Sequence, residues 1–248
     1  MYLCVDVGNT RIKWGVHDGA VWRERGAFLT REVTHEVARL GQSWSAWPVR
    51  QTVFSTVAGP EIVAQLALPQ NAYRLQARAE GHGVRVGYAR PEQLGSDRYA
   101  ALIAARALGL APCLVVLAGT AVTVDLLRET GEFPGGLIVP GRVAMAEALA
   151  SATHALKNVP GQACDWPDNT QDALETGRLR AMCGAIEGQW RRATHEAGQA
   201  VSVVLSGGDA NWLAPELEAL IGPVHRIEDL VLEGLCRVAE DLDRKGHG

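Results

Sequence analysis

One pattern occurs twice in this chain, and it constrains the fold more than any other feature. The segments VDVGNTRIKW (5–14) and VLAGTAVTVD (116–125) each contain an apolar strand, a turn built on small residues and a second strand, and they align when Gly8 is placed on Gly119. A third strand and a helix follow in each half. Many α/β proteins carry a glycine turn after a first strand, so the pattern leaves both duplication and coincidence open. Duplication predicts two similar α/β halves.

The length agrees with either one large domain or two compact ones, because 248 residues suffice for two domains of about 120. Hydrophobic residues make up 47% and charged residues 21%, which is a globular composition and argues against disorder. No charged or Ser-rich linker separates the halves. We therefore predict two closely packed domains, 1–112 and 113–248.

Charge and hydropathy exclude several kinds of partner. Acidic residues outnumber basic ones by 28 to 24, which argues against a general nucleic-acid binder. A local arginine group (Arg178, Arg180, Arg191, Arg192) is better explained as a solvated helix face. The longest apolar run, Cys113 to Ala118, is far shorter than the ~20 residues of a membrane span, and the N-terminus does not resemble a signal peptide. We expect a cytoplasmic protein with no membrane and no nucleic-acid partner.

The first repeat has the composition of a phosphate-binding loop. Gly8 lies between two strands, where backbone amides can approach a phosphate closely. Thr10 adds a hydroxyl and Lys13 a compact positive charge, while Asp6 at the strand end suits a hydrated Mg²⁺. Lys13 is one of only three lysines in a chain that otherwise uses arginine. The alternative is a tight β-hairpin with ordinary Asn-Thr turn chemistry.

Four further motifs could carry chemistry. The second repeat offers small and hydroxyl residues but no lysine, so it is a weaker phosphate loop by itself. At a predicted helix start, Asp97 could act as a general base with Arg98 beside it for an acidic substrate, although an acid in the first turn of a helix is common. Two glycine motifs, 135–141 and 206–209, would permit close backbone approach to a ligand.

The order of these motifs carries more information than any one of them. DxGNTxxK, GxDR, GTAxTxD, GGxIxPG and SGGDA follow one another along nearly the whole chain. In this order they resemble the type III pantothenate kinase family, which includes the Bvg accessory factor proteins. The first and third motifs also resemble the two phosphate loops of the sugar kinase, Hsp70 and actin superfamily. The resemblance implies an α/β fold of two tandem ribonuclease H-like domains with ATP in a central cleft.

The resemblance also implies an activity and its residues. The activity is ATP- and Mg²⁺-dependent phosphorylation of pantothenate to 4′-phosphopantothenate, the first step of coenzyme A biosynthesis. Asp97 would be the catalytic base, and Asp6 would hold Mg²⁺ through water. ATP would contact Asp6, Val7, Gly8, Asn9, Thr10, Arg11, Ile12, Lys13 and Thr120. Pantothenate would contact Tyr88, Gly95, Ser96, Asp97 and Arg98, together with Thr170, which in the family reaches substrate across a homodimer interface.

One position departs from the family pattern. Leu117 stands where the family usually has an aspartate that binds an activating potassium ion, and leucine offers no oxygen ligand. We therefore expect that potassium or ammonium is not required in the usual way. Two other functions remain open: a kinase for another small hydroxylated substrate, and a nucleotide-binding accessory protein with little turnover.

Overall fold

The computed structural model describes residues 1–152 and 160–246, which form two compact units. The first contains Met1–Leu110, Thr130–Pro134 and the chain from Asp229 onward, and the second contains Ala111–Glu129 and Gly135–Glu228. The chain first passes from one unit to the other between Leu110 and Ala111. The second half differs from the prediction, because a short excursion and the C-terminal helix belong to the first unit.

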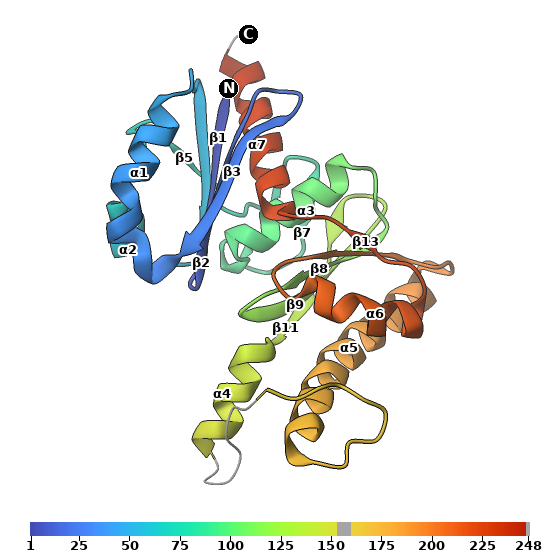
Figure 1. The fold of residues 1–248 in the computed structure, drawn as a ribbon. Coiled ribbons are helices and arrows are strands. Elements are labelled where there is room, and N and C mark those ends of the chain that lie inside the picture. The colour runs from blue at the N-terminus through green and yellow to red at the C-terminus, as the bar shows by residue number, and fades with distance from the viewer. Residues whose placement is uncertain (153–159, 247–248) are drawn as a thin grey trace. The chain divides into compact units, whose positions relative to one another are not determined.

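The first unit is built on a five-stranded sheet in the order β3-β2-β1-β4-β5 (Figure 1). Its strands are β1 (Tyr2–Val7), β2 (Arg11–His17), β3 (Trp22–Leu29), β4 (Gln51–Thr56) and β5 (Tyr73–Arg74). The β1 strand is antiparallel to β2 and parallel to β4. A short 3₁₀ turn, η1 (Thr30–Glu32), follows β3.

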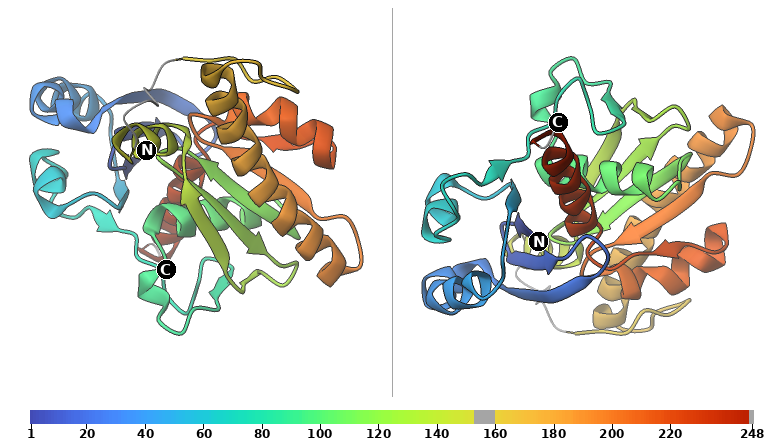
Figure 2. Two further views of the ribbon diagram at one scale, coloured as in Figure 1. Left: turned by 90° about the horizontal axis from the view of Figure 1, so that it is seen from below. Right: turned by 90° about the horizontal axis from the view of Figure 1, so that it is seen from above.

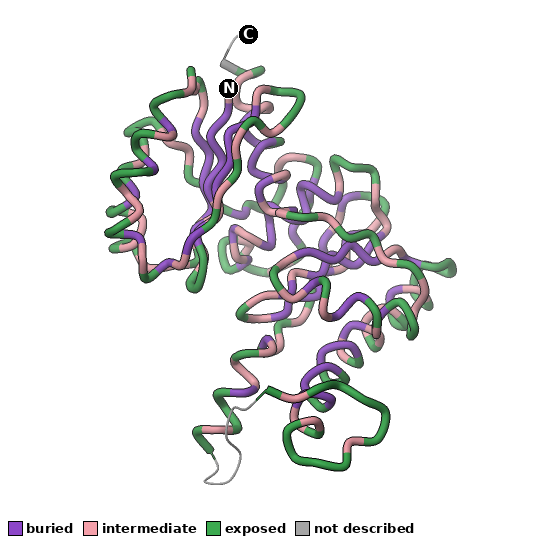
Figure 3. The backbone as a smooth tube through the Cα atoms, in the orientation of Figure 1, coloured by how far each residue is buried: buried purple, intermediate pink, exposed green. Residues whose placement is uncertain are grey.

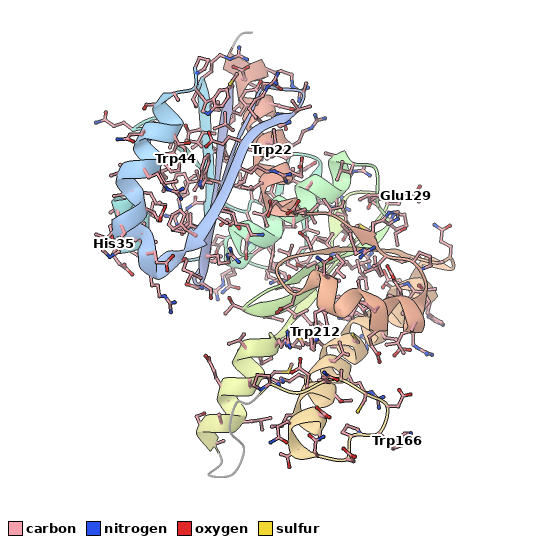
Figure 4. The ribbon with its side chains drawn as sticks, in the orientation of Figure 1. Trp22, His35, Trp44, Glu129, Trp166 and Trp212 are labelled. Carbon is pink, nitrogen blue, oxygen red and sulfur yellow. The ribbon has the colours of Figure 1, made fainter. Side chains whose placement is uncertain are left out.

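The two faces of this sheet have different coverings. Leu3, Val5 and Val7 point to one face, where they pack in a core with side chains of α1 (Val33–Ser45), including Trp44 (Figure 4). That face also receives α2 (Pro60–Gln65), and α7 (Leu230–Gly246) lies on the opposite side of the sheet (Figure 2). Because side chains alternate along a strand, Asp6 points to the α7 side.

A small three-stranded sheet completes the first unit. Its order is β10 (Glu132–Phe133), β7 (Val84–Val86) and β6 (Glu80–Gly81). The β10 strand comes from the second half of the sequence and pairs in parallel with β7. The next elements are the 3₁₀ turn η2 (Pro91–Gln93) and α3 (Ser96–Ala107). The second half of the chain thus supplies a strand to the first unit.

Helices α3 and α7 pack closely at a glycine. A Cβ built on Gly234 would lie 1.9 Å from the carbonyl oxygen of Ala100. We expect Gly234→Ala to lower the free energy of unfolding by about 1–3 kcal/mol, because the helix backbones must separate. Gly41→Ala in α1 is the matched control, since no atom lies within 4 Å of its added Cβ. Chemical denaturation measures both variants; equal stabilities would contradict the close packing.

The second unit repeats the topology of the first. Its sheet has the order β11-β9-β8-β12-β13, formed by β8 (Cys113–Ala118), β9 (Ala121–Leu127), β11 (Gly136–Pro140), β12 (Ser202–Ser206) and β13 (His225–Arg226). As in the first unit, the first strand is antiparallel to its hairpin partner and parallel to the strand on its other side. The repeated sequence pattern therefore corresponds to a repeated topology.

The described part of the second unit contains three helices: α4 (Arg142–Ala152), α5 (Thr170–Ala197) and α6 (Ala210–Ile221). Residues of α5 and α6 form a core with alternate residues of β8, β9 and β12, and the buried segments follow the strands in each unit (Figure 3). No helix in the described ranges is both long and apolar enough to cross a membrane.

Candidate active site

The strand register of the first unit places three polar side chains in a row. Asp6 is paired with Lys13 on β2 and with Ser55 on β4, so the three residues share the α7-facing side of the sheet. The Ser55 hydroxyl donates a hydrogen bond to Asp6 Oδ1 at 2.7 Å. The sequence pattern indicated Asp6 and Lys13 but not Ser55, because the residues around Ser55 have the pattern of a buried strand with no site motif.

The start of α3 is attached to the end of β4. The Ser96 hydroxyl donates to the Thr56 carbonyl at 3.0 Å and accepts from the Thr56 N–H at 2.9 Å. This reciprocal pair holds the GxDR motif next to the strand that flanks Asp6. Ser96 was predicted to contact substrate, and its hydroxyl is engaged here in positioning the helix.

Burial raises the pKa of both carboxyl groups of this site. Burial, together with the charges of Asp97 and Asp229, raises the pKa of Asp6 to about 6, against opposing effects of Ser55 and Lys13. Burial also raises the pKa of Asp97, although the backbone N–H and the charge of Arg98 lower it. A raised pKa makes Asp97 a stronger base than an exposed aspartate, and a cation beside Asp6 would relieve the repulsion.

The first loop forms a tight hairpin, and the residues at its tip are exposed to solvent. Gly8 N–H donates to the Arg11 carbonyl at 3.0 Å, which closes the turn. Thr30 supports the loop from β3's end: its N–H donates to the Thr10 carbonyl at 2.9 Å and its hydroxyl to the Gly8 carbonyl at 2.8 Å. Asn9, Thr10 and Arg11 are exposed, whereas the side chains of Val7 and Ile12 are buried in the core. The hairpin and phosphate-loop interpretations are therefore compatible.

Lys13 has a partner that the sequence did not reveal. Its ammonium group lies 2.7 Å from Asp229 Oδ1, and Arg25 lies 3.5 Å from Asp229 Oδ2. Asp229 is separated from Lys13 by 216 positions in the sequence. No local pattern connects residues so far apart.

An aromatic and basic group lies beside the GxDR helix. The rings of Tyr88 and Phe133 are 5.2 Å apart, and the Arg98 guanidinium lies 5.8 Å from the Phe133 ring centre. Tyr88 and Arg98 were predicted for the substrate site. Phe133, from β10, was missed because β10 pairs with β7, which lies more than forty positions earlier in the sequence. Gly95 leaves room for the base, since a Cβ there would lie 2.5 Å from Asp97 Oδ1.

The second unit brings three separate glycine motifs together. Gly141 N–H donates to the Thr120 carbonyl at 3.0 Å, and Asp209 N–H donates to the Ala118 carbonyl at 3.1 Å. Gly207 has φ +107° and packs on Ala118, where a Cβ would lie 2.2 Å from the carbonyl oxygen. The second loop thus contacts the motifs at 135–141 and 206–209.

Leu117 occupies the register position in the second unit that Asp6 occupies in the first. It is paired with Thr123 on β9 and with Ser206 on β12. The Thr123 hydroxyl is buried and has no hydrogen-bond partner among the described residues. The second unit therefore has Leu117 at the position that corresponds to Asp6, and the residues paired with Leu117 on the two neighbouring strands, Thr123 and Ser206, carry hydroxyl groups.

Thr170 is the first residue of α5 and is exposed. The preceding Asn169 caps this helix, accepting a hydrogen bond from Asp172 N–H at 3.0 Å. In the same helix, Arg178 is buried and pairs with Glu175. The prediction that all four of the helix arginines are solvated is therefore wrong for Arg178, because Glu175 balances its charge inside the unit.

Comparison with solved structures identifies the fold. A protein from Sinorhizobium meliloti assigned as a 2-dehydro-3-deoxygalactonokinase aligns with TM-score 0.64 at 15% identity, over 98% of this chain and 99% of its own. The activator of 2-hydroxyisocaproyl-CoA dehydratase from Clostridium difficile, determined with bound ADPNP, aligns with TM-score 0.58 at 10% identity, over 99% and 96%. At these identities the likeness concerns the fold, which is that of the actin-like ATPases and sugar kinases.

Sequence comparison then gives the family. The model of the type III pantothenate kinase family matches residues 2–192. A type III pantothenate kinase of Aromatoleum aromaticum is 45% identical over 248 aligned residues, covering 97% of this chain and 98% of that protein. The chain belongs to the type III pantothenate kinase family. The resemblance found in the motif order and the predicted fold class are both confirmed.

Proposed function

We propose that this protein transfers the γ-phosphoryl group of ATP to pantothenate, giving 4′-phosphopantothenate and ADP in the first step of coenzyme A biosynthesis. In a chain of this family, the observation that supports the proposal best is the position of Asp97. The GxDR carboxylate lies within electrostatic range of Asp6, at the strand end that leads into the first loop. A base beside a phosphate loop is the arrangement that phosphoryl transfer to an alcohol requires.

The residues of both units have separate tasks in this proposal. In the first unit, the amides of the first loop, Thr10 and Lys13 would bind ATP; in the second unit, Thr120 would be an ATP-contacting residue. Pantothenate would present its primary hydroxyl in line with the γ-phosphorus. As the new oxygen–phosphorus bond forms and the bond to ADP breaks, Asp97 would accept the hydroxyl proton. Catalysis would then depend on positioning and charge neutralisation.

The residues around Asp6 fit a divalent cation of the kind that accompanies ATP. Asp6 supplies a carboxylate held by Ser55, and carboxylate oxygens are ligands that Mg²⁺ prefers. Burial is the main cause of the raised pKa of Asp6, and the negative charges of Asp97 and Asp229 add to it; a cation at this place would offset both effects. When bound, Mg²⁺ neutralises charge on the phosphates; Asp6 would hold it through water.

Pantothenate carries a carboxylate, and Arg98 is the cation closest in sequence to the proposed base. Gly95 and Tyr88 would line the same site, with Ser96 fixing the helix that presents Asp97. Thr170 would contact substrate from the second subunit of a homodimer. Exposed apolar side chains in the second unit support such an interface, among them Val143, Leu149 and Trp166, the last with 91% of its surface exposed (Figure 4).

Incubation with Mg-ATP and pantothenate, followed by mass spectrometry for phosphopantothenate, tests the proposal. A panel of other small hydroxylated acids and sugars, assayed by ATP consumption, tests the alternative of a different kinase. Nucleotide binding without product from any acceptor would instead support an accessory protein. Absence of phosphopantothenate with the folded protein would overturn the proposal.

Leu117 leads to a prediction about monovalent cations. Its side chain cannot bind a cation, and in register it is flanked by Thr123 and Ser206 rather than by a carboxylate. We expect similar rates in potassium, in ammonium and in a bulky organic cation at equal ionic strength. Initial rates in the three buffers provide the measurement, with Leu117→Asp as the comparison variant. A steep requirement for potassium in the natural protein would contradict the prediction.

A further inference from the structure

Asp229 stands at a structural junction of the chain. It is the residue at which the chain returns to the first unit, immediately before α7. Its backbone has φ +53°, a left-handed conformation that few residues other than glycine adopt. Its carbonyl accepts from the Glu233 N–H at 3.2 Å and so begins the helix. This conformation fixes the direction in which the Asp229 side chain leaves the backbone.

The carboxylate of Asp229 meets two cations from neighbouring strands. Lys13 Nζ on β2 lies 2.7 Å from Oδ1, and the Arg25 guanidinium on β3 lies 3.5 Å from Oδ2. The Asp229 side chain is only 16% exposed, and that of Lys13 is 29% exposed. A pair this protected from solvent restricts the lysine more than a surface pair would.

Lysine needs such restriction at a catalytic site. Its ammonium is carried on a flexible stem with several rotatable bonds, and fixing it costs conformational entropy. The strand register already places Lys13 beside Asp6. Asp229 binds the ammonium group at the far end of the same side chain. The Lys13 side chain is therefore restricted at its backbone and at its ammonium group before a nucleotide binds.

We propose that Asp229 is a positioning residue for phosphoryl transfer, holding the Lys13 ammonium at the first loop. The proposal rests on the proposed kinase function. The Lys13 ammonium has three N–H donors, so it can contact a phosphate of ATP while it stays paired with Asp229, and Arg25 is a second counterion of the Asp229 carboxylate. Asp229 is not itself a nucleotide ligand, because a carboxylate repels a polyphosphate.

This role predicts a particular division between kcat and KM. In Asp229→Asn the backbone carbonyl still accepts from Glu233 N–H and begins the helix, but the neutral side-chain amide no longer attracts the Lys13 ammonium. We expect kcat to fall by roughly tenfold to a hundredfold, the cost of a misplaced catalytic group. The KM for ATP should not rise, because the change removes a repulsive charge. A purely structural ion pair would leave both constants of the folded variant unchanged.

A double-mutant cycle identifies the residue through which Asp229 acts. Lys13→Met removes the ammonium and keeps the length of the stem. If Asp229 acts through Lys13, then Asp229→Asn should lower kcat no further in the Lys13→Met background. Asp243→Asn is the matched control, because Asp243 lies on α7, the helix that Asp229 precedes, and pairs with Tyr2 and Arg50 away from the loop.

Steady-state kinetics with saturating pantothenate, and thermal unfolding of each variant, complete the experiment. A loss of kcat in Asp229→Asn that disappears in the Lys13→Met background supports the proposal. It is overturned by an unchanged kcat, by a raised KM for ATP with unchanged kcat, or by an additive loss in the double variant. Failure of the proposed function is distinguishable, because the natural protein would then form no phosphopantothenate.

Discussion

Asp97→Asn is expected to lower kcat by at least about a hundredfold, the lower range for loss of a general base. The amide cannot accept the proton of the substrate hydroxyl. Its oxygen can still accept the hydrogen bond that the Arg98 N–H donates to Asp97 Oδ1 at 2.8 Å. Because the start of α3 also depends on Ser96 and Thr56, the fold of the variant should persist. Product formation by mass spectrometry and steady-state rates measure the loss.

Two controls separate this effect from a change in binding. Affinity for a non-hydrolysable ATP analogue should be close to that of the natural protein, since Asp97 is proposed to act on the acceptor. Glu92→Gln removes an exposed carboxylate five positions before Asp97 in the sequence and should retain full activity. Turnover of Asp97→Asn close to the natural rate would remove Asp97 from the role of base.

The second large effect is expected at Asp6, where activity and stability should change in opposite directions. Asp6→Asn retains an oxygen that can accept from Ser55 but loses the charge proposed to hold Mg²⁺. We expect a loss of kcat/KM for Mg-ATP of at least about a hundredfold, comparable to removal of an electrostatic catalytic group. At pH 8 the same variant should unfold at a higher temperature, because it no longer buries a carboxylate.

The pH dependence of this stability difference follows from the pKa of Asp6, which rises from 3.8 to about 6 on folding. The stability that the natural carboxyl contributes is fully present below pH 3.8 and is lost as the pH rises through about 6. The advantage of Asp6→Asn in melting temperature should therefore be largest above pH 6 and should vanish near pH 4. Thermal unfolding at a series of pH values measures it.

Asp18→Asn provides a control of opposite sign. Backbone N–H groups of Val21 and Ala20 and the side chain of Arg23 lower the pKa of Asp18 to about 2. Asp18 therefore stabilises the fold at neutral pH, and Asp18→Asn should lower the melting temperature there. An Asp6→Asn variant that is no more stable than the natural protein at pH 8 would contradict the burial of a charged Asp6.

The local elements of both units could be predicted from the sequence, because their signals are local. Alternating apolar residues define β1 and β2, and glycine turns mark where the strands reverse. The repeated pattern correctly indicated two similar halves. The candidate base could be located for the same reason, since Gly95, Ser96, Asp97 and Arg98 are consecutive.

The site residues that could not be predicted from the sequence are those brought together by contacts between distant segments. Phe133 reaches Tyr88 because β10 pairs with β7, and nothing within residues 129–134 indicates a partner more than forty positions earlier. Ser55 was hidden within an apolar strand. Ser96 was assigned to substrate, although only the structure reveals its two hydrogen bonds with Thr56.

The sequence by itself determined the family, the order of the motifs, the strands that carry them and the identity of the proposed base. Each of these depends on residue type and spacing within a short segment. Only the tertiary structure decided that Asp6 lies between Lys13 and Ser55, and that the C-terminal helix belongs to the first unit and brings Asp229 to Lys13. Strand register and helix packing follow from the burial of apolar surface over the whole unit, which no single segment encodes.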